Sequence, residues 1–318
     1  MISLIIFARK TPDRLNYYEV MMRRGQNQND YTKLYTQVKV GYYGELRLDR
    51  EWKDANISGL LFHDFTCFNL AGYTHQMDTI FVCNHFVLVA EVKNVTGRIE
   101  FNPQTRQLIR YRENGAAEAF NSPIDQVKRH QQLLQNHFMT LPDYVPVEAA
   151  VVITNPSCLI SGASRDGDIP IFAVTGLRSI LAEIEKRHKH ITVNMKQVRA
   201  SLEKLYRPLA AQPWRNNEPV RTGVLCLTCN GKMIPTTNGF KCLNCNFLDA
   251  KHIAVRRTLH DYRVLFGHEI SNRQFREFAE VGSPDTAYKI LSRLLLTRKG
   301  SKRNATYLIP EDIYQQTN

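Results

Sequence analysis

The sequence predicts an α/β fold for residues 1–208, followed by two small modules. Apolar runs at 147–154 and 169–174 have the composition of buried strands. They alternate with segments such as 177–184, in which apolar residues recur at helical spacing. Strands that alternate with helices are typical of a sheet covered by helices. Two close pairs of cysteines and a basic C-terminal stretch then indicate separate structures.

The composition is that of a folded protein that binds an acidic partner. The chain has 318 residues, 43% of them hydrophobic, which favours a folded chain of more than one domain over a disordered one. No stretch approaches the roughly 20 apolar residues of a membrane span, and the opening MISLIIFARK lacks the features of a signal peptide. The formal net charge of +12 favours nucleic acid as a partner. A merely soluble basic protein would have the same charge.

The cysteine count points to a reducing compartment. There are seven cysteines, an odd number, and four of them form two close pairs. This favours bound metal over disulfides, and we expect a cytoplasmic protein. We expect the other three to pack in the core: Cys67, Cys83 and Cys158. The sequence leaves open a homo-oligomer or a protein partner.

The domain boundaries follow from changes in composition. A stretch with Pro and Asn at 209–221 predicts a linker. The cysteine pairs lie in a module at 222–250, and a basic α+β segment covers 255–318.

A charged hairpin lies within the α/β region. Two apolar runs, 79–83 and 86–92, flank a two-residue turn and predict a β-hairpin. Its strands have the composition of a sheet interior, where an unpaired charge is costly. Glu91 and Lys93 are two residues apart and therefore point to the same side of their strand. Asp78 precedes the partner strand, and the hairpin folds it back beside Glu91.

Two converging carboxylates repel each other unless a cation lies between them, and oxygen ligands suit Mg²⁺ or Mn²⁺. Asp78 and Glu91 are therefore candidate metal ligands. Lys93 could orient or deprotonate an attacking water and stabilise charge on a phosphoryl group. A buried Glu–Lys ion pair at the end of a strand accounts for the same residues without catalysis, and spacing alone does not separate the two interpretations.

Four short motifs in this region resemble the NERD domain, the nuclease-related domain, which is grouped with the PD-(D/E)XK nuclease fold. The motifs are GYYGE (41–45), QMD (76–78), EVKN (91–94) with Gly97, and NSPIDQ (121–126). Each motif is weak alone, but their order makes the signal specific. The resemblance covers residues 38–140 and implies a PD-(D/E)XK-like mixed sheet flanked by helices.

The resemblance also implies roles for individual residues. Asp78 and Glu91 would hold Mg²⁺, and Lys93 would act on the water. Glu45, from a helix expected near 43–54, would complete the acidic cluster, and Gln126 would approach it from a later helix. Without the resemblance, Glu45 belongs to a heavily charged helix whose charges are mostly solvated. Similarly, a Gln near a helix start more often serves in capping.

The cysteine module has the spacing of a zinc site. CLTC (226–229) and CLNC (242–245) are separated by a gap of 12 residues. Each pair is a turn that directs two thiolates at one point, and four thiolates make a closed, structural Zn²⁺ site. The candidate ligands are Cys226, Cys229, Cys242 and Cys245. A redox dithiol and an iron–sulfur cluster are the alternatives, but no βαβ context surrounds the pairs. The module resembles the zinc ribbons of type I topoisomerases, which contact single-stranded DNA.

The C-terminal segment has the pattern of a winged helix-turn-helix. Ser271 can cap a first helix, and Ser283 with Pro284 starts a second at 283–297, which would be the recognition helix. A strand, a basic turn at 298–303 and another strand follow, so that the basic turn would be the wing. The same fold also serves protein–protein contacts.

Basic residues of this segment are candidate DNA contacts. Residues 251–318 carry 12 Lys and Arg against 7 Asp and Glu, a net charge of +5. In the wing, the candidate phosphate contacts are Arg298, Lys299, Lys302 and Arg303. On the recognition helix, Lys289 and Arg293 are candidates for contact with base edges.

We therefore expect a metal-dependent deoxyribonuclease that uses Mg²⁺ or Mn²⁺ for catalysis and Zn²⁺ for structure. The alternatives are a non-catalytic DNA-binding or regulatory protein that keeps a nuclease fold as scaffold, and an RNA-processing nuclease.

Overall fold

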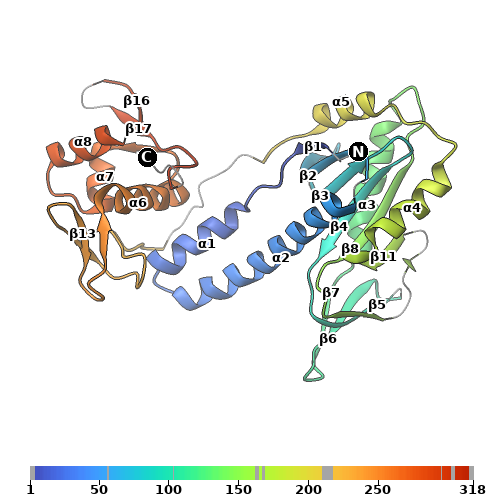
Figure 1. Cartoon of the computed structure of the whole chain (residues 1–318), viewed down its shortest axis with the longest axis horizontal. Helices are drawn as coiled ribbons and strands as arrows, with labels where there is room; N and C mark the ends of the chain where they lie inside the picture. The colour runs from blue at the N-terminus through green and yellow to red at the C-terminus, as the bar shows by residue number, and fades with distance from the viewer. Residues whose placement is uncertain are drawn as a thin grey trace. The chain divides into compact units, whose positions relative to one another are not determined.

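The computed structural model describes residues 4–55, 57–102, 104–161, 165–166, 169–209, 218–294, 296–301 and 305–314. The chain divides into two compact units, and Figure 1 shows its course. The first unit comprises Met1–Thr11 and Lys39–Ala210, and the second comprises Pro12–Val38 and Ala211–Asn318. Each unit has its own sheets and its own hydrophobic core.

The first unit contains a seven-stranded mixed sheet. In spatial order its strands are β1 (Leu4–Phe7), β2 (Leu60–Phe68), β3 (Thr74–Val82), β4 (Val87–Lys93), β8 (Val147–Ile153), β11 (Ile169–Ala173) and β10 (Arg165–Asp166). β1 is parallel to β2, and β4, β8 and β11 are parallel to one another. The β2–β3 and β3–β4 pairs are antiparallel. The hairpin expected from the sequence is therefore β3–β4, next to the centre of the sheet.

Helices cover both faces of this sheet (Figure 1). The helices are α2 (Gln28–Ala55), α3 (Pro123–Phe138), α4 (Leu177–His188) and α5 (Met195–Leu205). Apolar residues of α2 and α4 share a core with Leu61, Phe81 and Leu88 of the sheet. Residues of α3 and α5 share the other core with Phe62 and Ile80. A mixed sheet between two helical layers is thus present, as the sequence predicted.

A smaller four-stranded sheet extends from the end of β4. Its order is β7 (Ala117–Asn121), β6 (Gln107–Tyr111), β5 (Gly97–Asn102) and β9 (Cys158–Ser161). Gly97 begins β5 with φ of +85°, a backbone region that favours glycine. The chain can therefore turn out of the main sheet directly after β4.

The second unit combines the cysteine module with the basic segment. Its helices are α1 (Asp13–Arg24), the start of α2, α6 (Lys251–Phe266), α7 (Asn272–Ala279) and α8 (Pro284–Arg293). Its two three-stranded sheets are β12 (Met233–Pro235), β13 (Gly239–Cys242) and β14 (Leu248–Ala250), and β15 (Glu269–Ser271), β17 (Thr306–Leu308) and β16 (Thr297–Lys299). Val224, Phe240 and Leu259 belong to one core, so the cysteine module and the basic segment are packed together.

Residues 12–38, which the sequence assigned to the N-terminal domain, pack in this second unit. Val20 and Met21 of α1 are fully buried in its core. Arg24, also buried, donates to Asp261 of α6 over 2.6 Å. An apolar face and a buried ion pair therefore attach α1 to α6. Most of the proposed linker, residues 210–217, lies outside the described residues.

The helix caps in the C-terminal segment form as expected. Ser271 and Gln274 make a capping box at the start of α7. Ser283 caps α8, and Pro284 is its first residue. The helix ends at Arg293, four residues before the predicted end at 297. The two helices and the two strands that follow them, β16 and β17, are therefore present in the predicted order, whereas β15, which precedes α7 and completes the sheet, was not predicted.

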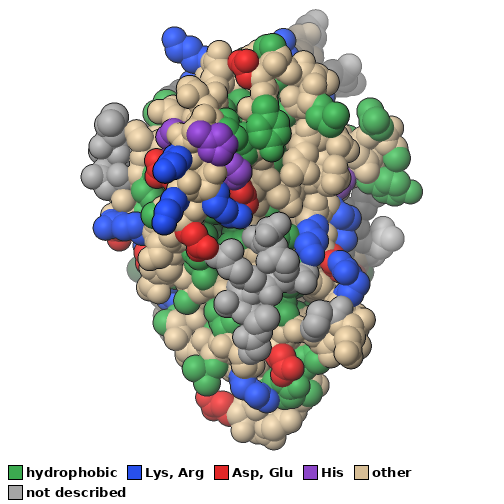
Figure 2. Space-filling view, turned by 90° about the vertical axis from the view of Figure 1, so that its right-hand side faces the viewer, with side chains coloured by type: hydrophobic (Ala, Val, Ile, Leu, Met, Phe, Trp, Pro, Cys, Tyr) green, Lys and Arg blue, Asp and Glu red, His purple; other side chains and the backbone are tan. Residues whose placement is uncertain are grey.

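No helix in the described part of the chain is long and apolar enough to cross a membrane. On the face drawn in Figure 2, Lys and Arg side chains are interspersed with Asp and Glu side chains.

Candidate active site

The register of the hairpin brings Asp78 beside the end of β4. Thr79 pairs with Ala90 across the two strands, so the next pair of positions is Asp78 and Glu91. The Oδ2 atom of Asp78 accepts a hydrogen bond of 2.8 Å from the backbone N–H of Val92. The convergence that the sequence predicted is therefore present.

Glu91 is held in an unusual environment for a carboxylate. Its side chain is only 2% exposed, and its Oε1 atom accepts from Lys93 Nζ at 2.6 Å. The Oε2 atom is buried without a hydrogen-bond partner in the described part of the chain. A buried polar atom without a partner is costly, and native proteins keep few of them. This oxygen is therefore available to a ligand such as a metal ion.

Helix α2 brings Glu45 to the same place. The helix passes close to the ends of β4 and β8 at Gly44, where a Cβ atom would lie 2.5 Å from Asn94 Cβ and 2.7 Å from Thr154 Oγ1. Only glycine permits this approach. Glu45 follows directly, and its carboxylate accepts a hydrogen bond of 3.0 Å from Arg9. The helix is longer than predicted, since it begins at Gln28 rather than near residue 43.

These acidic groups perturb one another. Burial, and then the charge of Asp78, raises the pKa of Glu91 to about 8. The same two causes raise the pKa of Glu45 to about 7. Burial also raises the pKa of Asp78. All three carboxylates can be ionised together at neutral pH only if a cation offsets them.

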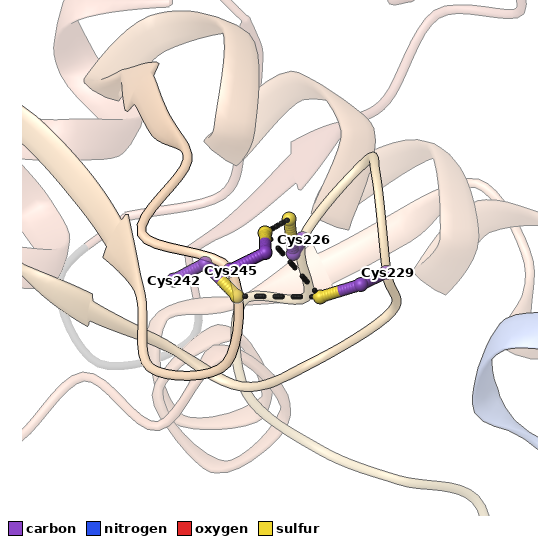
Figure 3. Close-up of side chains that lie close together, drawn as sticks. All are labelled: Cys226, Cys229, Cys242 and Cys245. Carbon is purple, nitrogen blue, oxygen red and sulfur yellow. Dashed lines mark hydrogen bonds between the residues drawn. The ribbon is translucent and has the colours of Figure 1, made fainter.

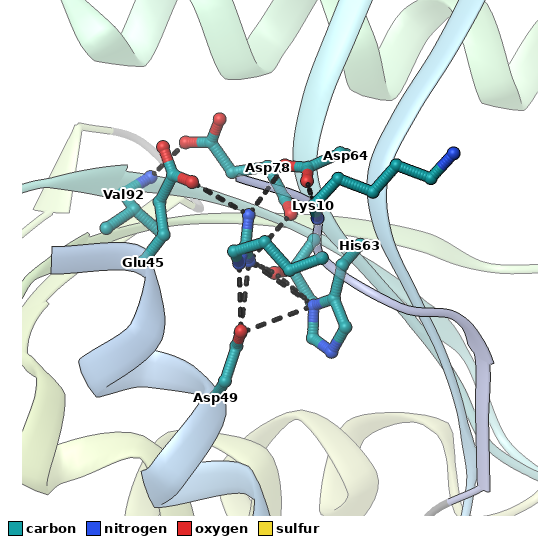
Figure 4. Close-up of polar contacts among 9 residues, drawn as sticks. Lys10, Glu45, Asp49, His63, Asp64, Asp78 and Val92 are labelled. Atoms are coloured by element: carbon teal, nitrogen blue, oxygen red, sulfur yellow. Dashed lines mark hydrogen bonds and ion pairs between the residues drawn. The ribbon is translucent and has the colours of Figure 1, made fainter. Parts of the chain in front are cut away.

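Arg9 was not predicted from the sequence. It follows β1, and its side chain is 2% exposed. Its guanidinium forms ion pairs with Glu45, Asp49 and Asp64, at 3.0, 2.8 and 2.7 Å (Figure 4). Burial lowers the pKa of Arg9, but the hydrogen bond and charge of Asp49, with the other two acids, raise it above its usual value. The only sequence signal was an arginine placed directly after an apolar run.

Asp64 is a second residue that sequence reasoning missed. In the β2–β3 ladder His63 pairs with Thr79 and Phe65 pairs with Met77 in one unbroken register, so Asp64 lies opposite Asp78. Its φ is +50°, in the left-handed region that non-glycine residues rarely adopt. No pattern of residue types marked this left-handed residue in advance.

Gln126 is not joined to the carboxylates by any hydrogen bond among the described residues. It lies half-buried in the first turn of α3, a helix that packs on the sheet face opposite to α2. A cleft of about 500 Å³ lies elsewhere in the first unit, at the turn of the hairpin, where Cys83 and His85 line it. It includes neither Asp78 nor Glu91.

Comparison with known families bears on this site. Residues 40–154 match the family of the nuclease-related domain, NERD. We call these residues the nuclease-related region. It includes the hairpin, Glu45 and Gln126, whereas Arg9 precedes it. No curated protein and no solved structure was found to match the chain.

The second unit contains a separate candidate metal site. The sulfur atoms of Cys226, Cys229, Cys242 and Cys245 all lie within 4.8 Å of one another (Figure 3). Three of these separations are 3.4, 3.5 and 3.6 Å. Four thiolates around one Zn²⁺ would lie about 3.8 Å apart, since Zn–S bonds are about 2.3 Å long. The four cysteines can therefore bind zinc.

Backbone N–H groups point at two of these sulfur atoms, and at Cys242 they favour the thiolate form. The N–H of Thr228 donates to Cys226 Sγ, and the N–H of Asn244 donates to Cys242 Sγ, both at 3.4 Å. Hydrogen bonds from the backbone of Cys245 and of Asn244 lower the pKa of Cys242 to about 6. The thiolate is the form that a metal binds. Among the described residues, this is the only group of three or more His, Cys, Asp or Glu side chains whose ligand atoms all lie within 4.8 Å of one another. The carboxylate oxygens of Glu45, Asp78 and Glu91 do not meet this criterion.

The predicted DNA contacts are exposed where the structure describes them. Lys289 and Arg293 lie on the open side of α8, and Arg298 and Lys299 lie on β16. Lys299 also forms an ion pair of 2.8 Å with Glu269. The other two candidates, Lys302 and Arg303, lie outside the described residues.

Proposed function

We propose that the chain is a metal-dependent deoxyribonuclease whose active site lies at the end of the β3–β4 hairpin. The nuclease-related region supports a nuclease-related function. The observation that carries the proposal is the Oε2 atom of Glu91. It has no hydrogen-bond partner among the described residues, although the side chain is only 2% exposed. Asp78 and Glu91 would hold the ion, and waters and substrate phosphate would supply its remaining ligands, as is usual for Mg²⁺.

A bound Mg²⁺ or Mn²⁺ would lower the pKa of a bound water and offset charge on the phosphate. The chain's own residues do the rest. Lys93 donates to Glu91 Oε1, and 30% of its side chain is exposed. It can therefore keep this carboxylate oriented and also reach a water or phosphate oxygen. Asp78 is oriented by the N–H of Val92. Gln126 stays a prediction as a further group of this site.

The second unit would hold the DNA. Its four-cysteine site would bind structural Zn²⁺ as a zinc ribbon, and α7, α8 and their sheet would act as a winged helix. Exposed Lys289, Arg293 and Arg298 can contact phosphates and base edges.

One observation favours a second function. The 2.6 Å ion pair of Lys93 with Glu91 is what a structural role at a strand end would require. On that interpretation the nuclease-related region is a scaffold, and the protein binds DNA without cleaving it.

Cleavage assays with single-residue variants separate these functions. Asp78→Asn, Glu91→Gln and Lys93→Ala should each reduce Mg²⁺-dependent cleavage of plasmid and single-stranded DNA by on the order of a hundredfold or more, because each removes a metal ligand or a charge stabiliser. Glu148→Gln is the matched control: this buried glutamate is on the neighbouring strand β8, where it pairs with His188. It should retain cleavage. Full cleavage activity in any two of the three site variants would contradict the assignment of the active site to the β3–β4 hairpin. Cleavage of RNA but not of DNA would show that the substrate is RNA.

A further inference from the structure

Arg9 places a fixed positive charge inside the acidic cluster. Its Nη1 atom lies between two carboxylates, 3.0 Å from Glu45 Oε2 and 2.7 Å from Asp64 Oδ1 (Figure 4). The guanidinium therefore occupies the space between these two acids. A cation that bridges two carboxylates in this way takes the place that a metal ion would otherwise take.

The remaining donors of Arg9 hold the guanidinium in this orientation. Nε and Nη2 donate to the two oxygens of Asp49, at 2.8 and 3.0 Å. Nη2 also lies 3.1 Å from the backbone oxygen of Asp78 and 3.1 Å from Thr79 Oγ1. A guanidinium has five N–H donors in a rigid plane, and here every nitrogen is engaged. The group cannot rotate away without breaking several of these bonds.

The backbone of Asp64 is shaped for this contact. The backbone of Asp64 is left-handed, with φ of +50°, and one of its carboxylate oxygens accepts from Arg9 while the other accepts a 3.1 Å hydrogen bond from the N–H of Lys10. A left-handed conformation at a non-glycine residue persists only where the surroundings require it. The segment that carries Arg9 and Lys10 thus requires Asp64 at this position.

We infer that Arg9 is the built-in second cation of this site, so that the acidic cluster takes one divalent ion and not two. Arg9 offsets one of the three negative charges of Glu45, Asp49 and Asp64 and fills the space between Glu45 and Asp64, while Asp78 and Glu91 remain for the ion. A second divalent ion beside Glu45 would meet the guanidinium at close range, where like charges repel strongly in a partly buried site. The inference rests on the proposed function, because it assumes an ion at Asp78 and Glu91. It adds the stoichiometry of the site and assigns Arg9 as a positioning residue.

Counting bound Mn²⁺ tests the inference without any assay of cleavage. Zinc-loaded, full-length protein is titrated with Mn²⁺ in the absence of nucleic acid, and free Mn²⁺ is followed by electron paramagnetic resonance. We expect one Mn²⁺ per chain, lost in Glu91→Gln. Glu45→Gln should keep one ion, with an affinity reduced by less than about tenfold, since only a neighbouring charge is removed. Two ions in the wild type, or no binding in Glu45→Gln, would overturn the inference. No ion in the wild type would instead overturn the proposed metal site.

Arg9→Gln gives a second readout. This variant removes the internal cation, so Mn²⁺ can occupy the space between Glu45 and Asp64. A second Mn²⁺ should bind, and Mn²⁺ should raise the Tm of this variant more than that of the wild type. An equal rise in both proteins with one ion in each counts against the inference. If Arg9→Gln does not fold, the ion counts of the wild type and of Glu45→Gln decide the matter.

Discussion

Glu91 is the residue at which burial and charge conflict most directly. Its carboxylate is removed from water, lies next to Asp78, and has one oxygen without a partner among the described residues. Such a group is destabilising unless it is protonated or bound to a cation. The same features that make the residue unfavourable in the free protein therefore make it suited to an ion.

This conflict predicts that stability without a divalent ion falls as pH rises. Burial raises the pKa of Glu91 to about 8, whereas an unfolded glutamate has a pKa of about 4.3. Between these values the native chain keeps a proton that the unfolded chain has released, so the free energy of unfolding decreases from about pH 5 to 8. We expect a loss on the order of a few kcal/mol across this window.

Urea unfolding at several pH values, in buffer without added divalent ions, measures the effect. Glu91→Gln is the control: glutamine does not titrate, so the fall in stability with pH should be smaller, while Glu45, whose pKa is also raised, still contributes. Added Mn²⁺ should also reduce this fall in the wild type. A wild-type slope equal to that of Glu91→Gln over this window would contradict the assignment of a raised pKa to Glu91.

Residues within one hairpin were predictable, whereas those from distant segments were not. Strand alternation and hairpin length were sufficient to place Asp78, Glu91 and Lys93 together. Arg9 reaches Asp64 across 55 positions of sequence, through the parallel pairing of β1 with β2. Neither that pairing nor the left-handed backbone at Asp64 has a signature in residue type. The contacts of Arg9 and Asp64, which join distant segments of the chain, could therefore not be predicted from the sequence.

At the scale of elements, the position of α2 depends on one glycine. Gly44→Ala would place a Cβ atom against Asn94 and Thr154, and the helix would have to move away from the end of β4. We expect a loss of roughly 1–3 kcal/mol in the free energy of unfolding, the usual cost of overpacking. Glu45 should move with the helix, so Mn²⁺ affinity should fall as well.

Gly41→Ala is the matched control for this variant. It lies in the same helix, and nothing lies within 4 Å of the Cβ position. It should stabilise the chain by about 0.5–1 kcal/mol, because alanine is the better helix former. Equal stability of the two variants in urea unfolding would show that the close approach at Gly44 has no energetic consequence.

The cysteine module should depend on zinc. We expect one zinc per chain in freshly purified protein and none after replacement of Cys226, Cys229, Cys242 and Cys245 by serine. Its three short strands bury too little to be stable alone, so the metal would supply folding free energy. Elemental analysis measures the zinc content. Zinc retained in the fourfold variant, or absent from the wild type, would refute the site.

Loss of zinc should leave the first unit folded. Trp52 is buried in that unit and stacks on Phe81, so its fluorescence reports on the α2 side of the sheet. The chain has two tryptophans. In a Trp214→Phe background, chelation should leave the Trp52 signal unchanged, because the sheet core is large enough to stand alone.

The types of element were predictable, but their boundaries and partners were less so. Cap residues at Ser271 and Ser283 correctly marked two helix starts, because capping is a local interaction. The N-terminal half of α2 was missed, although Tyr31, Leu34, Tyr35 and Val38 recur there at helical spacing. That α1 packs with α6 depends on Asp261, which lies more than 230 positions away in sequence from its partners Arg23 and Arg24. Packing between such distant segments cannot be deduced from local pattern.

At the scale of the whole molecule, the chemistry and the larger share of the net positive charge are assigned to different units. The acidic cluster belongs to the first unit, and the net charge of +5 over residues 251–318 belongs to the second. If the second unit binds DNA through phosphate contacts, binding and cleavage are separable functions. Mutations in one unit should then leave the other function largely intact.

The exposed cations of the second unit provide the test. Replacing Lys289, Arg293 and Arg298 together by alanine removes up to three phosphate contacts. DNA affinity should fall, and the slope of log K against log salt should become shallower by up to roughly three units. Turnover at saturating DNA should change far less, because the acidic cluster is untouched. Glu91→Gln should show the reverse, with DNA bound and no product released.

A control that removes the same number of charges makes this result specific. Lys186, Lys189 and Lys196 are exposed cations of the first unit, and their triple alanine variant should keep the wild-type salt slope. Binding is measured by fluorescence anisotropy of labelled DNA across a series of salt concentrations. If the first-unit variant loses the slope and the second-unit variant keeps it, the nuclease-related unit itself holds the DNA. The C-terminal helices and sheet would then be a protein-contact domain, because their exposed cations would have no phosphate to neutralise.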